Sequence, residues 1–164
     1  MSHALTETYR TSSSEETKKL GHDIGESLSR ATIKSITLNG PIVLALQGDL
    51  GAGKTTFVQG FLKGLGSRKR VVSPTFVLMK RHRLSVPGAT TGKKFSNVFH
   101  IDAYRLKKPE QFEVLGMSEI LGDPRNVVII EWPEQAKEFI PKNALWLKFK
   151  YGKKENERTI TIKR

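Results

Sequence analysis

Apolar residues recur along this chain in two periods, and each period predicts a different kind of element. After the segment "SSEE", apolar residues stand at near-helical intervals, at Leu20, Ile24, Leu28 and Ala31. The segment itself has capping-box spacing, in which a serine and a glutamate satisfy the first free N–H groups of a helix. We therefore predict an amphipathic helix over residues 13–31.

Short apolar runs bounded by turn residues predict the next elements. The run "GPIVLALQG" predicts a buried strand, and "KTTFVQGFLKGLG" directly after it predicts a helix that ends at Gly66. A strand with a Ser-Pro interruption is expected in "VVSPTFVLMKRH". The order strand, glycine turn, helix is typical of α/β proteins.

The second half of the chain continues this alternation. The segment "NVFHID" predicts a strand, "PEQFEVLGMSEILG" a helix, "NVVIIEW" a buried strand, and "PEQAKEF" a short helix that Pro141 ends. The last segments, "ALWLKFKY" and "RTITIKR", alternate apolar and polar residues around "GKKENE", which predicts an antiparallel hairpin.

These elements predict an α/β fold of three layers. We expect a mainly parallel central sheet with helices on both faces, extended by the C-terminal antiparallel hairpin. The length of 164 residues suits a single domain over residues 1–164. Within it we expect a flexible N-terminal tail at residues 1–12 and a basic solvated loop at residues 83–95.

Composition narrows the class of protein. The chain is 37% hydrophobic and 27% charged, as in a folded globular domain, and the absence of cysteine excludes disulfides and thiolate metal sites. The start "MSHALTETYR" lacks the apolar core of a signal peptide, so we expect a cytoplasmic protein without a membrane segment. The net charge of +12 indicates an acidic partner or, alternatively, serves solubility.

The segment "GDLGAGKT" carries the clearest chemistry. Gly48, Gly53, Lys54 and Thr55 meet the phosphate-binding pattern G-x-x-x-x-G-K-[ST], between a predicted strand and a predicted helix. Glycines let backbone N–H groups form an anion-binding nest, and the helix adds its positive N-terminal end. The expected nucleotide-binding residues are Gly48, Asp49, Leu50, Gly51, Ala52, Gly53, Lys54, Thr55 and Thr56.

The chemistry of a P-loop assigns a part to each polar side chain. Lys54 would reach the β and γ phosphates of a nucleoside triphosphate, and the Thr55 hydroxyl would hold Mg²⁺, which prefers oxygen ligands. The alternative is a structural glycine turn followed by a chance Lys-Thr pair. The position of the segment between strand and helix favours nucleotide binding.

A P-loop hydrolase also needs an acid near the end of a buried strand. Glu131 ends the apolar run "VVIIE" and is a candidate for the metal site; the alternative is a cap of the next helix. In "HIDAYR", strand period places His100, Asp102 and Tyr104 on one face, but Asp102 could equally pair with Arg105 on an exposed strand.

For two residues near these acids, His100 and Trp132, the sequence allows both a structural and a functional role. His100 alone is more typical of a hydrogen-bonded structural residue than of a catalyst. Trp132 directly follows Glu131 and is either a core residue or a cover for a nucleotide or partner surface.

Five motifs in this order, "GDLGAGKTTF", "SPTF", "HIDAYRL", "LGMSEIL" and "IEWPE", closely resemble those of the TsaE (YjeE) family of bacterial P-loop ATPases. The resemblance runs from about Thr17 to the C-terminal hairpin. It implies a part in making threonylcarbamoyladenosine at tRNA position 37. In that pathway TsaC makes threonylcarbamoyl-AMP and TsaD transfers the group with TsaB. The family member binds the TsaB–TsaD pair and hydrolyses ATP to support turnover, so tRNA contact would be indirect and activity low without partners.

The resemblance also implies functions for individual residues. Lys54 and Thr55 would bind phosphate and Mg²⁺ with Thr56 beside them, and residues 73–76 would form a mobile switch. Asp102 would be the catalytic acid, acting with Lys54, and Glu131 a Mg²⁺ ligand, directly or through water. Trp132 matches the family tryptophan at the nucleotide site.

Two rival functions remain open on the sequence. A small-molecule P-loop kinase would need a lid, for which residues 81–95 are a candidate. A basic RNA-binding module would leave the P-loop unexplained. The high charge and the long basic loop depart from the usual family pattern; that loop is either a solvated connection or a tRNA contact.

Overall fold

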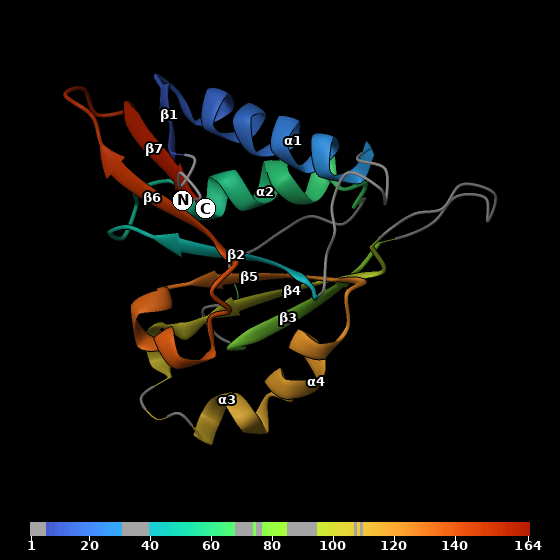
Figure 1. Cartoon of the computed structure of the whole chain (residues 1–164). Coiled ribbons are helices and arrows are strands. Elements are labelled where there is room, and N and C mark those ends of the chain that lie inside the picture. Colours follow the sequence, from blue (N-terminus) through green and yellow to red (C-terminus); the bar gives the residue numbers. More distant parts are fainter. Residues whose placement is uncertain are drawn as a thin grey trace, which may run out of the picture.

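The protein forms three layers around one mixed sheet (Figure 1). The computed structural model describes residues 6–30, 40–67, 74, 77–84, 95–106, 108 and 110–164. Among them the sheet has the strand order β1-β7-β6-β2-β5-β4-β3. The strands are β1 (Thr6–Thr11), β2 (Ile42–Gln47), β3 (Met79–Arg83), β4 (Asn97–Asp102), β5 (Asn126–Glu131), β6 (Leu145–Tyr151) and β7 (Arg158–Lys163).

The four central strands of the sheet run parallel. β2 pairs in parallel with β5 and β6, and β5 pairs in parallel with β4. The outer strands β7, β1 and β3 are antiparallel to their neighbours, and β6 with β7 forms the predicted hairpin. The register places Asp102 opposite Glu131, so the carboxyl ends of β4 and β5 lie side by side. The predicted fold class is confirmed.

Helices cover both faces of the sheet, as Figure 1 shows. The long helices α1 (Ser14–Arg30) and α2 (Lys54–Gly64) pack on one face. The other face carries the short helices and two of the 3₁₀ turns, namely α3 (Glu110–Val114), α4 (Met117–Gly122), η2 (Pro133–Gln135) and η3 (Lys137–Phe139).

Successive side chains of each strand point to opposite faces of the sheet. Leu44 and Leu46 of β2 pack in the core under α2 with Phe57 and Phe61, whereas Val43 packs in the core under α3 and α4. A strand with both faces buried is apolar throughout, which is why "IVLAL" is continuous rather than alternating.

Glycines bring α1 and α2 into backbone contact. A side chain at Gly21 of α1 would overlap the carbonyl of Phe57, and one at Gly60 of α2 would overlap the carbonyl of Lys18. Gly25 and Gly64, one turn further along each helix, meet the facing backbone in the same way. Close contact along the helix pair fixes the axis of α2, whose N-terminus ends the glycine-rich loop.

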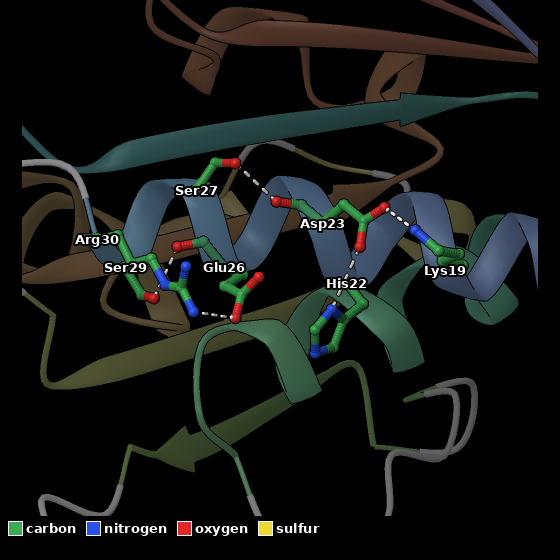
Figure 2. A network of polar contacts seen from close by, with 7 residues as sticks. All are labelled: Lys19, His22, Asp23, Glu26, Ser27, Ser29 and Arg30. Atoms are coloured by element: carbon green, nitrogen blue, oxygen red, sulfur yellow. Dashed lines mark hydrogen bonds and ion pairs between the residues drawn. The ribbon is translucent and has the colours of Figure 1, made fainter.

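The start of α1 has the predicted capping box. Ser13 Oγ accepts a hydrogen bond from the Glu16 backbone N–H at 3.1 Å, and Glu16 Oε2 accepts one from the Ser12 N–H at 2.7 Å. The solvent-facing side of the helix carries the polar network of Figure 2, which includes the ion pairs Lys19–Asp23 and Arg30–Glu26. Exposed pairs of this spacing contribute only about 0.3–0.5 kcal/mol each.

Three predicted elements need correction. Residues 6–11 are β1 rather than part of a flexible tail, because they pair along their whole length with β7; backbone hydrogen bonds order a strand that has few apolar side chains. The helix predicted in "PEQFEVLGMSEILG" is two helices, since Gly116 adopts a left-handed φ of 74° between them. The segment "PEQAKEF" forms two 3₁₀ turns, η2 and η3.

Some predictions concern residues outside the described ranges. Residues 73, 75 and 76 of the "SPTF" segment and residues 85–94 of the predicted basic loop are among them. Of the described residues of that loop, Arg83 is exposed at the end of β3, whereas Leu84 and Phe95 are buried in the core. Of the helices that the structure describes, none has the length and apolar character needed to cross a membrane.

Candidate functional site

The glycine-rich loop connects the end of β2 to the start of α2, at the carboxyl edge of the parallel strands. Gly48 approaches β6 so closely that a Cβ would lie 2.7 Å from the carbonyl oxygen of Phe149. Gly53, directly before α2, has a φ of 99°, a conformation that other residues rarely adopt. Glycine is therefore required at both ends of the loop.

Lys54 lies folded back over the loop. Its Nζ donates hydrogen bonds to the carbonyl oxygens of Gly48 and, at 2.9 Å, Asp49. The same atom lies 4.3 Å from the centre of the Trp132 ring, and only 5% of the residue is exposed. Burial lowers the pKa of this amine below its ordinary value, and nearby carboxylates, Glu131 foremost, oppose the shift.

The acids Asp102 and Glu131 end adjacent parallel strands in register. Asp102 is tied down on both sides: its N–H donates to the Leu78 carbonyl at 2.9 Å, and its Oδ1 accepts from the Tyr104 N–H at 3.0 Å. Glu131 Oε1 lies 2.7 Å from Nε2 of His100, which is fully buried. The side chains of His100 and Asp102 share one face of β4, as predicted, and Ile101 faces the opposite core.

Trp132 turns its ring toward the loop through an unusual backbone conformation. Its φ of 57° is left-handed, which costs a bulky residue energy and is found mainly at functional sites. The ring packs against Tyr104 with centroids 5.0 Å apart and lies beneath the Lys54 amine. β4 ends at Asp102, so it is the 3₁₀ turn η1 (Ala103–Arg105), rather than a continued strand, that brings Tyr104 here.

These side chains enclose a cavity of about 360 Å³, a volume suited to a small-molecule ligand. The residues that line it are Leu50, Gly51, Gly53, Lys54, Thr55, Thr56, Asp102, Tyr104, Arg105, Glu131 and Trp132. The predicted site residues Gly48, Asp49 and Ala52 are not in the lining. Ala52 is buried in the core, and the other two contribute the carbonyls that Lys54 contacts.

The structure adds residues that sequence reasoning missed. Arg105 lines the cavity, and its position in "HIDAYRL" three residues after Asp102 was a usable signal. His100 was interpreted as a hydrogen-bonded structural residue, in agreement with its contact to Glu131, but the sequence did not indicate that Glu131 is the partner. Tyr151 and Arg158 of the C-terminal hairpin contact the loop from outside the cavity, and nothing near them in the sequence indicates it.

The donors present fit Mg²⁺ of the kind that accompanies a nucleotide. The described residues contain no cluster of three histidine or acidic side chains that could hold a metal by itself. Mg²⁺ in phosphate sites uses one or two protein oxygens and completes its shell with phosphate and water. Thr55 and Glu131 line the same cavity, and the hydrogen bond with His100 occupies only one carboxylate oxygen of Glu131.

Comparisons with known proteins agree on one family. The family model described as "Threonylcarbamoyl adenosine biosynthesis protein TsaE" matches residues 11–160. A Bacillus subtilis protein named tRNA threonylcarbamoyladenosine biosynthesis protein TsaE is 37% identical over 73% of this chain and 68% of its own length. A Haemophilus influenzae protein of the same name is 34% identical over 67% of this chain, and the match spans only 63% of that relative.

A solved structure agrees with the sequence comparisons. The crystal structure of Bacillus subtilis YdiB superposes with a TM-score of 0.69 at 28% identity, covering 99% of this chain and 88% of that one. The likeness therefore extends over nearly the whole chain.

Proposed function

The chain belongs to the TsaE family of threonylcarbamoyladenosine biosynthesis, and from this premise we propose that it is the ATP-hydrolysing component of the tRNA N6-threonylcarbamoyladenosine machinery. The observation that carries the proposal is one cavity in which the Lys54 amine, the Thr55 hydroxyl and two strand-end carboxylates come together. That set of groups matches what a P-loop hydrolase uses to bind phosphates and to position water.

In the proposed complex with ATP, the loop and Lys54 bind the phosphates. The N–H groups of the loop and the N-terminus of α2 face the anion, and the Lys54 amine leaves the loop carbonyls for the β and γ phosphate oxygens. Thr56 lies beside Thr55 in the cavity wall. Trp132, whose ring already lies against the Lys54 amine, would cover the bound nucleotide.

The two acids would have different roles, one toward the attacking water and one toward Mg²⁺. Asp102 is the proposed group that orients the attacking water, because both its backbone and one carboxylate oxygen are fixed by hydrogen bonds. Glu131 with Thr55 would hold Mg²⁺, either directly or through water. When bound, that ion neutralises charge on the phosphate oxygens. His100 would keep the Glu131 carboxylate in one orientation.

We further propose that the partners are the TsaB–TsaD pair, that tRNA is reached through this complex, and that the protein works in the cytoplasm with low activity alone. The mouth of the cavity supports a protein partner, because Leu50 is 84% exposed and Tyr104 is 61% exposed. In the proposed complex, a partner protein would cover these two side chains.

The test is ATP turnover of the chain alone and with the TsaB–TsaD pair, with tRNA modification followed in the same tubes. Lys54→Ala is the blank, and Lys63→Ala, on the exposed side of α2, is the matched control. Turnover that is slow alone, rises with the pair and needs Lys54 but not Lys63 supports the proposal. Turnover and modification that the pair and Lys54→Ala leave unchanged refute it. A phosphorylated small molecule would instead favour a kinase.

A further inference from the structure

The C-terminal hairpin contacts the glycine-rich loop through two side-chain hydrogen bonds. Tyr151, at the end of β6, donates from its hydroxyl to the Leu50 carbonyl. Arg158, at the start of β7, donates from Nη2 to the Gly51 carbonyl at 3.2 Å. Both bonds reach the loop from outside the cavity, because neither hairpin residue lines it.

The two hairpin residues are themselves braced. The guanidinium of Arg158 lies over the Tyr151 ring, with Cζ 4.7 Å from its centroid. Arg158 Nη1 donates to the carbonyls of Glu155 at 2.6 Å and Glu157 at 2.8 Å in the hairpin turn. Contacts within the hairpin therefore orient the Arg158 guanidinium and the Tyr151 ring toward the loop, in addition to their bonds with the loop itself.

Lys54 holds the two preceding carbonyls of the same loop, those of Gly48 and Asp49. Four consecutive carbonyls thus accept hydrogen bonds from side chains, two from Lys54 and two from the hairpin. Under the proposed function the Lys54 bonds are temporary, since its amine must turn to the phosphates. The hairpin bonds do not compete with the nucleotide and can persist while it is bound.

This arrangement has a consequence for the loop amides. In an anion-binding nest the N–H groups face the anion, so the carbonyls of the same peptides turn outward. A donor fixed on an outward carbonyl holds that peptide in place, and a cationic donor also polarises it. The Leu50 carbonyl shares its peptide with the Gly51 N–H. The Gly51 carbonyl shares its peptide with the Ala52 N–H, which donates to the Asp49 carbonyl at 3.1 Å, so the Arg158 bond stabilises this turn of the loop. If the loop is already ordered before the nucleotide binds, less conformational entropy is lost on binding.

We propose that Tyr151 and Arg158 are positioning residues for nucleotide binding, which hold the loop in its phosphate-binding conformation after Lys54 has left the carbonyls. The proposal rests on the proposed function, because it takes ATP as the ligand of the loop. It assigns the C-terminal hairpin to the nucleotide site, although the hairpin lies outside the cavity.

The experiment compares Tyr151→Phe and Arg158→Gln with the wild type and with Lys150→Gln. Lys150 is exposed on β6 and has no hydrogen bond to the loop among those the structure describes, so its variant loses the same charge as Arg158→Gln. ATP affinity is measured by calorimetry, KM and kcat by turnover, and the fold by the melting temperature. Arg158→Lys is included as the conservative variant.

We expect Tyr151→Phe and Arg158→Gln each to weaken ATP affinity about 2- to 10-fold, as loss of one hydrogen bond predicts. KM should rise with kcat unchanged, Arg158→Lys should recover part of the affinity, and Lys150→Gln should match the wild type. Wild-type affinity in a folded Tyr151→Phe variant overturns the proposal, and this variant decides alone if Arg158→Gln fails to fold. If the wild type does not bind ATP, the proposed function fails instead.

Discussion

Nε2 of His100 lies 2.7 Å from Oε1 of Glu131, across the adjacent strands β4 and β5. His100 is fully buried and Glu131 is 4% exposed. A buried carboxylate needs a hydrogen-bond donor to offset its lost hydration, so we place the imidazole proton on Nε2. The other ring nitrogen, Nδ1, has no hydrogen-bond partner among the described residues.

The pair predicts that His100→Ala destabilises the protein. Glu131 would keep a buried carboxylate without its donor, so we expect the free energy of unfolding to fall by about 1–3 kcal/mol. Urea denaturation measures it. His22→Ala, on the partly exposed side of α1, is the control and should change stability by less than about 0.5 kcal/mol. In a Glu131→Gln background the loss should shrink, and equal losses in both backgrounds would contradict the pairing.

Lys54→Ala should weaken ATP binding by about 10- to 100-fold. Under the proposed function, the ammonium would make charge-assisted hydrogen bonds to phosphate that the loop amides cannot replace. Calorimetry with ATP gives the affinity, and Lys63→Ala controls for the loss of one positive charge from the same helix. Equal affinities for Lys54→Ala and the wild type would rule out this assignment.

The lowered pKa of Lys54 predicts that ATP binding weakens in alkaline solution. Under the proposed function the amine would bind phosphate in its charged form, so ATP affinity should be full below the pKa of the amine and be lost as the pH rises through it. Because burial places this pKa below the ordinary value of 10.5, the affinity should fall before that pH is reached. Titrations from pH 7 upward measure the fall. Lys54→Ala should not show it, and a wild-type affinity that is flat up to pH 10.5 would contradict the shift.

Asp102→Asn separates the chemistry of this residue from its structural contact. Asparagine keeps an oxygen that can accept from the Tyr104 N–H but carries no charge. We therefore expect unchanged stability and ATP affinity, with hydrolysis slowed by about 100-fold or more. Single-turnover kinetics measure the chemical step. Glu119→Gln, on the exposed side of α4, is the control, and normal hydrolysis in Asp102→Asn would remove Asp102 from the mechanism.

Glu131→Gln should change the requirement for Mg²⁺. In the proposed complex, loss of the carboxylate charge would remove a Mg²⁺ ligand or the anchor of a bound water, so the Mg²⁺ concentration that gives half-maximal ATP binding should rise several-fold. Because glutamine can still pair with His100, the fold should persist. Binding followed at a series of Mg²⁺ concentrations makes the comparison. A Mg²⁺ dependence identical to that of the wild type would exclude the assignment.

The features that could be predicted from the sequence are mostly those formed by residues close together in the chain. The apolar run before Gly48, the glycine spacing and the helix after Lys54 lie within one short stretch, where backbone conformation depends on neighbouring residues. The capping box of Ser13 and Glu16 is local in the same way. The parallel central strands also followed from local patterns, because a strand buried on both faces has no polar alternation. The glycine-rich loop, the fold class of the protein and the candidate acids were therefore predictable.

Tertiary structure alone decided the contacts between distant segments. The strand order places β6 beside β2 and β7 beside β6, and this brings Arg158 to Gly51 over a separation of 107 residues. Strand order also brings His100 to Glu131 and gives residues 6–11 a partner strand. These contacts leave no periodic signal, because the hydrogen bonds that make them depend on which strands become neighbours and not on nearby residues.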